Sequence, residues 1–226
     1  MNQATLLSAM TTLSSEPLAW AAIVGAYLLG SVPFGLLIAR RVKGVDLRRI
    51  GSGNIGASNA VRAMGRKWGL SVFALDFLKG WAPVLAVAHV GFEREIVPLL
   101  QVLVGTAAVL GHCYSIYLRF TGGKGVATGC GAIVAIEPLV FVAGGLVWLL
   151  VRYTTRYLGL ASILMGATFP LAAWALDDTR ELVVGSSLLT VLILVRHRSN
   201  IRRMLAGTEP RAGEKTDPTE IARPHV

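Results

Sequence analysis

Long apolar segments are the feature that most restricts what this chain of 226 residues can fold into. Residues 18–39, 68–90 and 96–114 each approach or exceed the roughly 20 apolar residues that a helix needs to cross the hydrocarbon core of a bilayer. A backbone in lipid must satisfy its hydrogen bonds internally, so such segments form helices. Charged residues make up only 15% of the chain, against about 25% in soluble domains. The sequence therefore predicts an all-α integral membrane protein.

The rest of the apolar sequence is divided into shorter segments. Glu137-Pro138 is a predicted turn, because proline disfavours helical backbone at the residue before it. With a second turn at 152–157, the shorter segments are 125–136, 139–151, 158–176 and 182–195. We expect seven transmembrane helices, with five or six as alternatives. The short segments at 125–136 and 139–151 are expected to tilt or to lengthen into their flanks.

A single membrane domain, residues 18–205, is expected between two terminal segments, because every loop is too short to fold alone. Residues 1–17 form an N-terminal segment. Residues 206–226 form a polar tail with prolines at 210, 218 and 224, a composition that predicts disorder.

The distribution of positive charge predicts the orientation. With seven helices, one side of the membrane holds the loops 40–67, 115–124 and 152–157 and everything after residue 195. Those segments carry nineteen of the 22 Lys and Arg residues, so this side is expected to be cytoplasmic. The N-terminus is then outside and the C-terminus inside. The same distribution accounts for the net charge of +9, and no nucleic-acid partner is expected, since no domain-sized soluble segment could hold one.

The first glycine-rich loop reads Gly51-Ser52-Gly53-Asn54-Ile55-Gly56-Ala57-Ser58-Asn59, with Arg62 following. Its GxGxxG spacing occurs in dinucleotide sites, but those need a preceding strand, and here a membrane helix precedes the loop. A plain connector is the alternative. The polar side chains and the arginine favour a phosphate site, since glycines let backbone N–H groups turn toward an anion.

The second loop contains Gly122, Gly123, Lys124 and Gly125. It is not a Walker A loop, because Lys124 is followed by glycine instead of Ser or Thr. A helix break with one more positive-inside charge explains it equally well on spacing alone. His197 and Asn200 share one helix face at the end of the last helix, where a histidine could also merely complement the helix dipole.

Three ordered motifs together resemble one family: 51–59 with Arg62, 122–128 and 196–200 are similar to the motifs of the bacterial acyl-phosphate:glycerol-3-phosphate acyltransferases, the PlsY type. The likeness extends from about residue 26 to residue 205. It implies a seven-helix inner-membrane enzyme that moves a fatty acyl group from acyl phosphate to the 1-hydroxyl of glycerol 3-phosphate. The products would be 1-acyl-glycerol 3-phosphate (lysophosphatidic acid) and phosphate, in the first step of phospholipid synthesis. Its partners would be these two substrates and membrane lipid, with no cofactor or metal, and we expect a monomer.

The resemblance also implies the site. The catalytic residues would be Ser52, Asn54, His197 and Asn200. The substrate-binding residues would be Gly51, Gly53, Ser58, Asn59, Arg62, Gly122, Gly123, Lys124, Gly125 and Ser162. We expect His197 to position substrate and not to deprotonate it, because no carboxylate accompanies it in its motif. The acyl tail is expected among residues such as Leu28, Phe73 and Leu164. The main alternative function is a transporter for a phosphorylated solute, because transporters also bind anions at helix ends.

Overall fold

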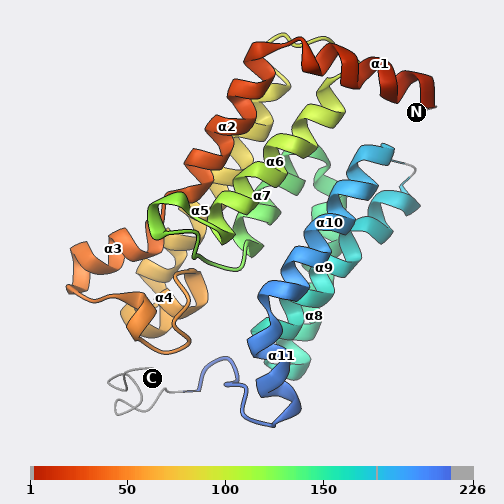
Figure 1. The fold of residues 1–226 in the computed structure, drawn as a ribbon. Coiled ribbons are helices and arrows are strands. Elements are labelled where there is room, and N and C mark those ends of the chain that lie inside the picture. The colour runs from red at the N-terminus through yellow and green to blue at the C-terminus, as the bar shows by residue number, and fades with distance from the viewer. Residues whose placement is uncertain (1–2, 177, 215–226) are drawn as a thin grey trace.

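The computed structural model describes residues 3–176 and 178–214, and every regular element in that part is a helix (Figure 1). The α-helices are α1 (Gln3–Ser14), α2 (Pro17–Ser31), α3 (Phe34–Lys43), α4 (Ala57–Met64), α5 (Arg66–Val87), α6 (Val97–Cys113), α7 (Val126–Ile136), α8 (Pro138–Thr155), α9 (Leu158–Ala175), α10 (Arg180–Arg196) and α11 (Arg198–Leu205). Two short 3-10 helices are η1 (Leu47–Arg49) and η2 (Ile116–Leu118).

Each apolar segment of the sequence coincides with a helix or a pair of helices. By length and composition, four spans in the described residues could cross a membrane: Pro17–Lys43, α5, α8 and α9. The number is five if α10 and α11, which meet at a bend of 55°, count as one span. The helices α6 and α7 are apolar but shorter. The predicted segment 139–151 does lengthen into its flanks, since α8 has 18 residues.

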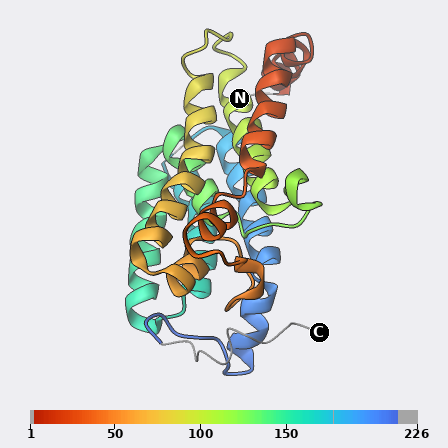
Figure 2. The same cartoon turned by 90° about the vertical axis from the view of Figure 1, so that its left-hand side faces the viewer.

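The first apolar segment, predicted as the span 18–39, lies within the candidate span Pro17–Lys43 but is not one uninterrupted helix. The α2 helix ends at Ser31, and α3 begins at Phe34 after Val32 and Pro33. Proline restricts the residue before it and has no N–H to donate. The carbonyl of Val32 is freed from the helix and accepts a hydrogen bond from Lys79 Nζ at 3.0 Å. This break turns α3 and the first loop away from the axis of α2 (Figure 2).

The helices pack in two groups. The α2, α5, α6 and α7 helices form one group, in which α2 packs on α6 and α5 on α7 (Figure 1). A Cβ on Gly80 of α5 would lie 2.0 Å from the carbonyl oxygen of Thr128, so glycine permits this close contact. The α8, α9 and α10 helices form the second group, and α10 also packs on α6. The short helices α4 and α11 lie at one end of the bundle (Figure 1).

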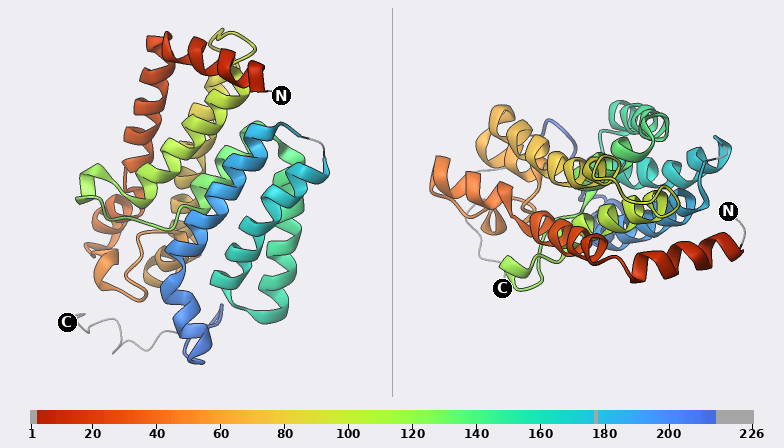
Figure 3. Two further views of the ribbon diagram at one scale, coloured as in Figure 1. Left: turned by 45° about the vertical axis from the view of Figure 1, so that its right-hand side comes forward. Right: turned by 90° about the horizontal axis from the view of Figure 1, so that it is seen from above.

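Both chain termini contain residues with a defined structure. The N-terminal segment contains α1, which crosses the other end of the bundle at an angle to α2 (Figure 3). Residues 206–214 of the predicted disordered tail contact the bundle: Arg156 Nη2 donates to the carbonyl of Ala212 at 2.9 Å, and Ala212 N–H donates to the carbonyl of Arg156 at 2.8 Å. Residues 215–226 lie outside the described part.

Candidate active site

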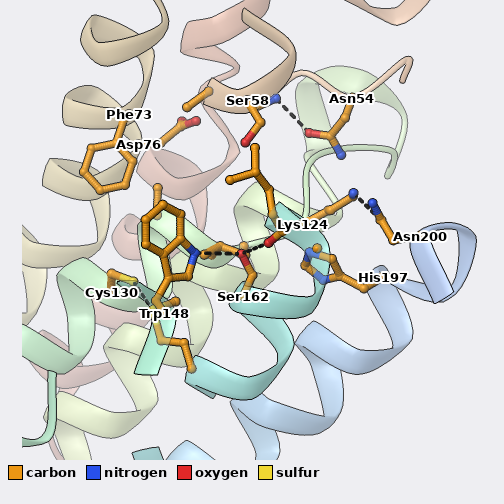
Figure 4. A pocket seen from close by; sticks show the side chains of 18 of the residues that line it. Asn54, Ser58, Phe73, Asp76, Lys124, Cys130, Trp148, Ser162, His197 and Asn200 are labelled. Carbon is orange, nitrogen blue, oxygen red and sulfur yellow. Dashed lines mark hydrogen bonds between the residues drawn. The ribbon is translucent and has the colours of Figure 1, made fainter. Parts of the chain in front are cut away.

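A cavity of about 540 Å³ lies between the two helix groups, toward the end that carries α4 and α11 (Figure 4). This volume is within the usual range for a small-molecule site. Ten of the fourteen residues implied by the sequence line it: Ser52, Asn54, Ser58, Asn59, Arg62, Lys124, Gly125, Ser162, His197 and Asn200. The other four, Gly51, Gly53, Gly122 and Gly123, do not line it. The three motifs, far apart in the sequence, thus meet at one cavity.

Three helix N-termini border the polar end of the cavity. The lining includes Ala57 and Ser58 at the start of α4, Val126 and Ala127 at the start of α7, and Leu158 at the start of α9. The first turn of a helix has N–H groups without intrahelical partners, and the helix dipole adds partial positive charge there. Three such ends at one cavity favour the binding of an anion.

Asn59 holds the first loop together from inside. Its amide Nδ2 is within 3.0 Å of the carbonyl oxygens of Leu47, Ile50 and Asn54, and its Oδ1 accepts from Ser52 N–H at 3.1 Å. The side chain is buried, with 2% of its surface exposed. Although Asn59 touches the cavity, its polar atoms are used within the loop. Its side chain therefore has a scaffolding arrangement, and the substrate contact implied by the resemblance stays a prediction.

The other polar residues of the first loop lie nearer to the cavity. Asn54 Oδ1 accepts from Gly56 N–H at 2.8 Å, which fixes the loop just before α4 begins. Ser58 is in the first turn of α4, and Arg62 follows one turn later on the same face. Both line the cavity. A hydroxyl, the open end of a helix and a guanidinium are thereby presented together.

The second loop separates its lysine from its glycines. Lys124 lines the cavity, whereas Gly122 and Gly123 pack against the end of α6. A Cβ at Gly123 would lie 1.9 Å from His112 Nε2, and the Gly123 N–H already donates to the carbonyl of His112 at 3.0 Å. The carbonyls of Gly122 and Gly123 accept hydrogen bonds from the Arg196 guanidinium at 2.8 and 3.0 Å, respectively. These contacts hold the loop against α6 and α10 and so position Lys124.

The third motif lies at the bend between α10 and α11. The sequence prediction placed His197 and Asn200 at the end of one helix, but α10 ends at Arg196 and Asn200 belongs to α11. Both side chains face the cavity beside Lys124 (Figure 4). Lys124 Nζ donates to Asn200 Oδ1. His197 Nδ1 lies 2.8 Å from the carbonyl oxygen of Ile193, which makes Nδ1 the protonated nitrogen of the neutral ring and leaves Nε2 as an acceptor.

A glutamate from the tail completes this network. Glu209 Oε1 accepts from Asn200 Nδ2 at 2.5 Å, and Glu209 Oε2 accepts from Arg203 Nε at 2.7 Å. The Glu209 carboxylate is buried and lines the cavity. A chain of contacts thus runs from Arg203 through Glu209 and Asn200 to Lys124. It fixes which face of the Asn200 amide points toward the lysine.

Burial and neighbouring cations lower the pKa values of two groups at the cavity. Burial lowers the pKa of Lys124 to about 8; the Glu209 carboxylate opposes this shift, and Arg203, Arg62 and Arg196 add to it. His197 follows the last residue of α10. Burial, and then the charge of Lys124, lower its pKa to about 4. His197 is therefore neutral at neutral pH, while Lys124 is mostly cationic.

A buried ion pair lies at the wall of the cavity, which Asp76 and His112 also line. Asp76 Oδ1 is 2.8 Å from Lys79 Nζ and 3.6 Å from His112 Nδ1, and each of the three side chains is almost wholly buried. Since Lys79 also holds the carbonyl of Val32, the pair connects the break after α2 with the end of α6.

An apolar arm extends the cavity away from the cations. It is lined by Phe73 of α5, Cys130 of α7, Met165 of α9 and several residues of α8. Trp148 of α8 borders it and donates from Nε1 to Ser162 Oγ at 3.4 Å (Figure 4). Ser162 also donates to the carbonyl of Leu158, so its hydroxyl orients the tryptophan. Of the three residues expected near an acyl tail, Phe73 lines the cavity, but Leu28 and Leu164 do not.

Sequence reasoning missed several residues of this site. Glu209 and Arg203 were assigned to the tail and to a generally basic segment, and Trp148 to an apolar helix. A carboxylate twelve residues after His197, in an otherwise basic stretch, was the available signal for Glu209. Among the described residues, no group of three or more His, Cys, Asp or Glu side chains could hold a metal ion.

Known proteins resemble this chain along most of its length. A family model described as glycerol-3-phosphate acyltransferase matches residues 20–207. The glycerol-3-phosphate acyltransferase of Agrobacterium fabrum is 42% identical over 212 residues, which cover 92% of this chain and 100% of the relative. That of Geobacter sulfurreducens is 46% identical, with 82% of this chain and 93% of the relative covered.

Solved structures agree in fold as well as in sequence. A crystal structure of PlsY, an integral membrane glycerol 3-phosphate acyltransferase in its glycerol 3-phosphate form, matches with a TM-score of 0.81 and 42% identity, covering 86% of this chain and 96% of that one. The lysophosphatidic acid form matches with a TM-score of 0.78 and 39% identity, covering 90% and 97%. A helical membrane fold and a cationic cavity with an apolar arm thus define a membrane acyltransferase. The chain belongs to the glycerol-3-phosphate acyltransferase family, whose substrates are glycerol 3-phosphate and an acyl donor.

Proposed function

We propose that the enzyme transfers a fatty acyl group from acyl phosphate to the 1-hydroxyl of glycerol 3-phosphate, giving 1-acyl-glycerol 3-phosphate and phosphate. The single observation that carries this proposal is the two-part cavity, in which cations and helix N-termini occupy one end and apolar side chains the other. An acyl phosphate has the same division between a charged head and an apolar tail. A transporter reading has no such support, since the chain belongs to an acyltransferase family.

The polar end would hold two phosphate groups that repel each other. Arg62 and Lys124, on different motifs, would offset that repulsion, and Arg203 adds a third cation at the rim. Arginine can grip a phosphate with two parallel hydrogen bonds, whereas lysine acts as a compact charge. The N–H groups at the start of α4 and α7 could stabilise the oxyanion that develops on the acyl carbonyl, together with Ser52 and Asn54.

The reaction needs mainly positioning, because acyl phosphate is a mixed anhydride with an activated carbonyl. The 1-hydroxyl oxygen of glycerol 3-phosphate attacks the carbonyl carbon, and the bond from that carbon to the phosphate oxygen breaks. The leaving phosphate takes the hydroxyl proton. Holding two reactants in a suitable geometry can contribute about 7–11 kcal/mol. Asn200, fixed between Lys124 and Glu209, is suited to orient a glycerol hydroxyl.

His197 would position substrate in this scheme. Its Nδ1 is engaged with the carbonyl of Ile193, and Nε2 is left to accept a hydrogen bond from a glycerol hydroxyl. A ring with a pKa near 4 is a weak base at neutral pH. If His197→Asn raises KM for glycerol 3-phosphate while kcat is retained, the positioning role is supported. Loss of kcat alone would contradict it.

We infer seven membrane crossings with the N-terminus outside, the C-terminus inside and the active site facing the cytoplasm of a bacterial inner membrane. The positive charge of the loops supports this orientation. At 1.5 Å per residue, the 11 residues of α7 span only about 17 Å of a core about 30 Å thick. The α7 helix by itself is therefore shorter than the hydrocarbon core.

Purified protein in detergent would be given glycerol 3-phosphate with palmitoyl phosphate, palmitoyl-CoA or palmitoyl-acyl carrier protein. We expect phosphate and lysophosphatidic acid in equal amounts from palmitoyl phosphate only. Arg62→Ala and Lys124→Ala should lose nearly all activity. Arg41→Ala is the matched control, because Arg41 is an exposed cation that does not line the cavity. Turnover of palmitoyl-CoA at the same rate would refute the proposed donor, and fully active Arg62 and Lys124 variants would refute the proposed site.

A further inference from the structure

A glycine on α8 leaves the apolar arm of the cavity open. Gly145 lines the cavity, and a Cβ built on it would meet no heavy atom within 4 Å. Its neighbour Gly144 is different, since a Cβ there would lie 2.4 Å from the ring of Phe169. The two adjacent glycines therefore have different structural roles: Gly144 lets α8 pack closely on α9, whereas Gly145 borders empty space.

The lining residues of α8 give the direction of the arm. Leu149 and Trp148 come first from the polar end, Gly145 is about one turn further, and Phe141 and Val142 are another turn beyond. Residues 141 and 149 are about 12 Å apart along the helix axis at 1.5 Å per residue. Val142 and Leu149 are exposed, so one side of the arm opens toward lipid.

We propose that Gly145 sets the length of acyl chain that the enzyme accepts, by leaving room for the part of the tail that runs from Trp148 to Phe141. This inference rests on the proposed function, because it takes the acyl tail of the donor as the occupant. The occupant follows from the continuity of the arm with the cationic end, where the phosphate of that same molecule would bind. A side chain at position 145 would block the arm about one turn short of its end.

The geometry gives the size of the effect. One helical turn is about 5.4 Å, and an extended chain advances about 1.2 Å per bond, so a blocked turn excludes about four methylene groups. Each buried methylene contributes about fourfold in affinity, which sets an upper limit of about 200-fold. Since the arm is open on one side, a displaced tail can stay in lipid. We therefore expect a change in specificity of about tenfold or more.

The test compares wild type with the graded series Gly145→Ala, Gly145→Leu and Gly145→Phe. The assay measures kcat/KM for lauroyl phosphate and palmitoyl phosphate, which differ by four carbons. The variants should fold, because position 145 borders open space and Ala, Leu and Phe each have a higher helix propensity than glycine. Binding of labelled glycerol 3-phosphate checks this independently of the acyl donor. Leu150→Phe is the matched control, since Leu150 is an exposed residue of α8 that does not line the cavity.

We expect the ratio of lauroyl to palmitoyl kcat/KM to rise with the size of residue 145, by about tenfold or more for Leu and Phe, and not to change in Leu150→Phe. An unchanged ratio in active Leu and Phe variants would overturn the inference. Equal loss of activity toward both donors, with glycerol 3-phosphate still bound, would overturn it as well. A wild-type enzyme that used neither donor would refute the proposed function itself. That outcome is distinguishable from failure of the inference about Gly145, because it is seen without any substitution.

Discussion

Raising the pH should weaken glycerol 3-phosphate binding because Lys124 loses its charge. Burial lowers the pKa of Lys124 from the usual 10.5 to about 8, so the folded free enzyme loses this cation as the pH rises through 8. About nine tenths of the lysine is cationic at pH 7 and about one tenth at pH 9. We therefore expect kcat/KM for glycerol 3-phosphate to fall about tenfold between these pH values. A lysine with an ordinary pKa would give almost no change.

The effect should appear in KM more than in kcat. A bound phosphate favours the charged form of Lys124 and raises its pKa in the complex, so kcat at saturating substrate should persist to higher pH. Titration of the substrate phosphate does not contribute to the pH dependence between pH 7 and 9, since its second pKa is about 6. His197 titrates near 4, also below this range.

Initial rates of phosphate release, measured in detergent from pH 6.5 to 9.5, would give the profile. Lys124→Arg is the control, because arginine stays cationic throughout this range. Its kcat/KM should be lower than that of wild type at pH 7 but should not fall near pH 8. A fall of equal size in Lys124→Arg, or a flat wild-type profile, would refute the assignment of the pH dependence to Lys124.

Three further changes test other parts of the structure. Glu209→Ala should lower kcat/KM for glycerol 3-phosphate by tenfold or more, and Glu209→Gln by less, because a charged hydrogen bond such as that from Asn200 to Glu209 contributes about 1.5–3 kcal/mol. Equal kcat/KM in wild type and both variants would show that the tail does not orient Asn200. Asn59→Ala should destabilise the fold by about 1–3 kcal/mol, since the buried carbonyls of the first loop lose their hydrogen-bond donor. A thiol-reactive dye that reports exposure of the two buried cysteines on heating would measure the midpoint of thermal unfolding. An unchanged midpoint would contradict the scaffolding role. A cysteine placed at Glu93 should react with an impermeant reagent added to intact spheroplasts and one at Lys43 should not; the reverse pattern would invert the proposed orientation.

The sequence predicted the apolar helices well because their cause is local. A run of apolar residues long enough for a bilayer must form a helix, and each of the seven predicted segments overlaps one or two helices of the structure. The break at Pro33 was less clear, since a proline can also sit in a kinked helix. The α8 helix ends later than the predicted segment 139–151, because Arg152 and the residues up to Thr155 continue the helix despite their polarity.

The site was predicted as a set of motifs, and most of its members do meet at the cavity. Their individual tasks could not be predicted. Asn59 and Asn54 have the same side-chain chemistry, yet both polar atoms of the Asn59 amide are bonded within the loop, whereas Asn54 makes one bond, to Gly56 N–H just before α4. Gly122 and Gly123 were expected to bind substrate, but their close contact with α6 depends on His112, which lies ten and eleven positions earlier in the sequence.

What the sequence by itself determined is the class of the molecule: a helical membrane protein with basic loops and three motifs, most of whose residues line one cavity. These follow from properties that adjacent residues share, namely hydrophobicity over a segment and charge in a loop. Only the tertiary structure decided that Lys124 contacts Asn200 across 76 residues, that Glu209 returns from the tail to hold Asn200, and that Gly145 borders an open arm. The physical reason is that these contacts depend on how helices pack, and packing brings together side chains whose own sequence surroundings do not indicate a partner.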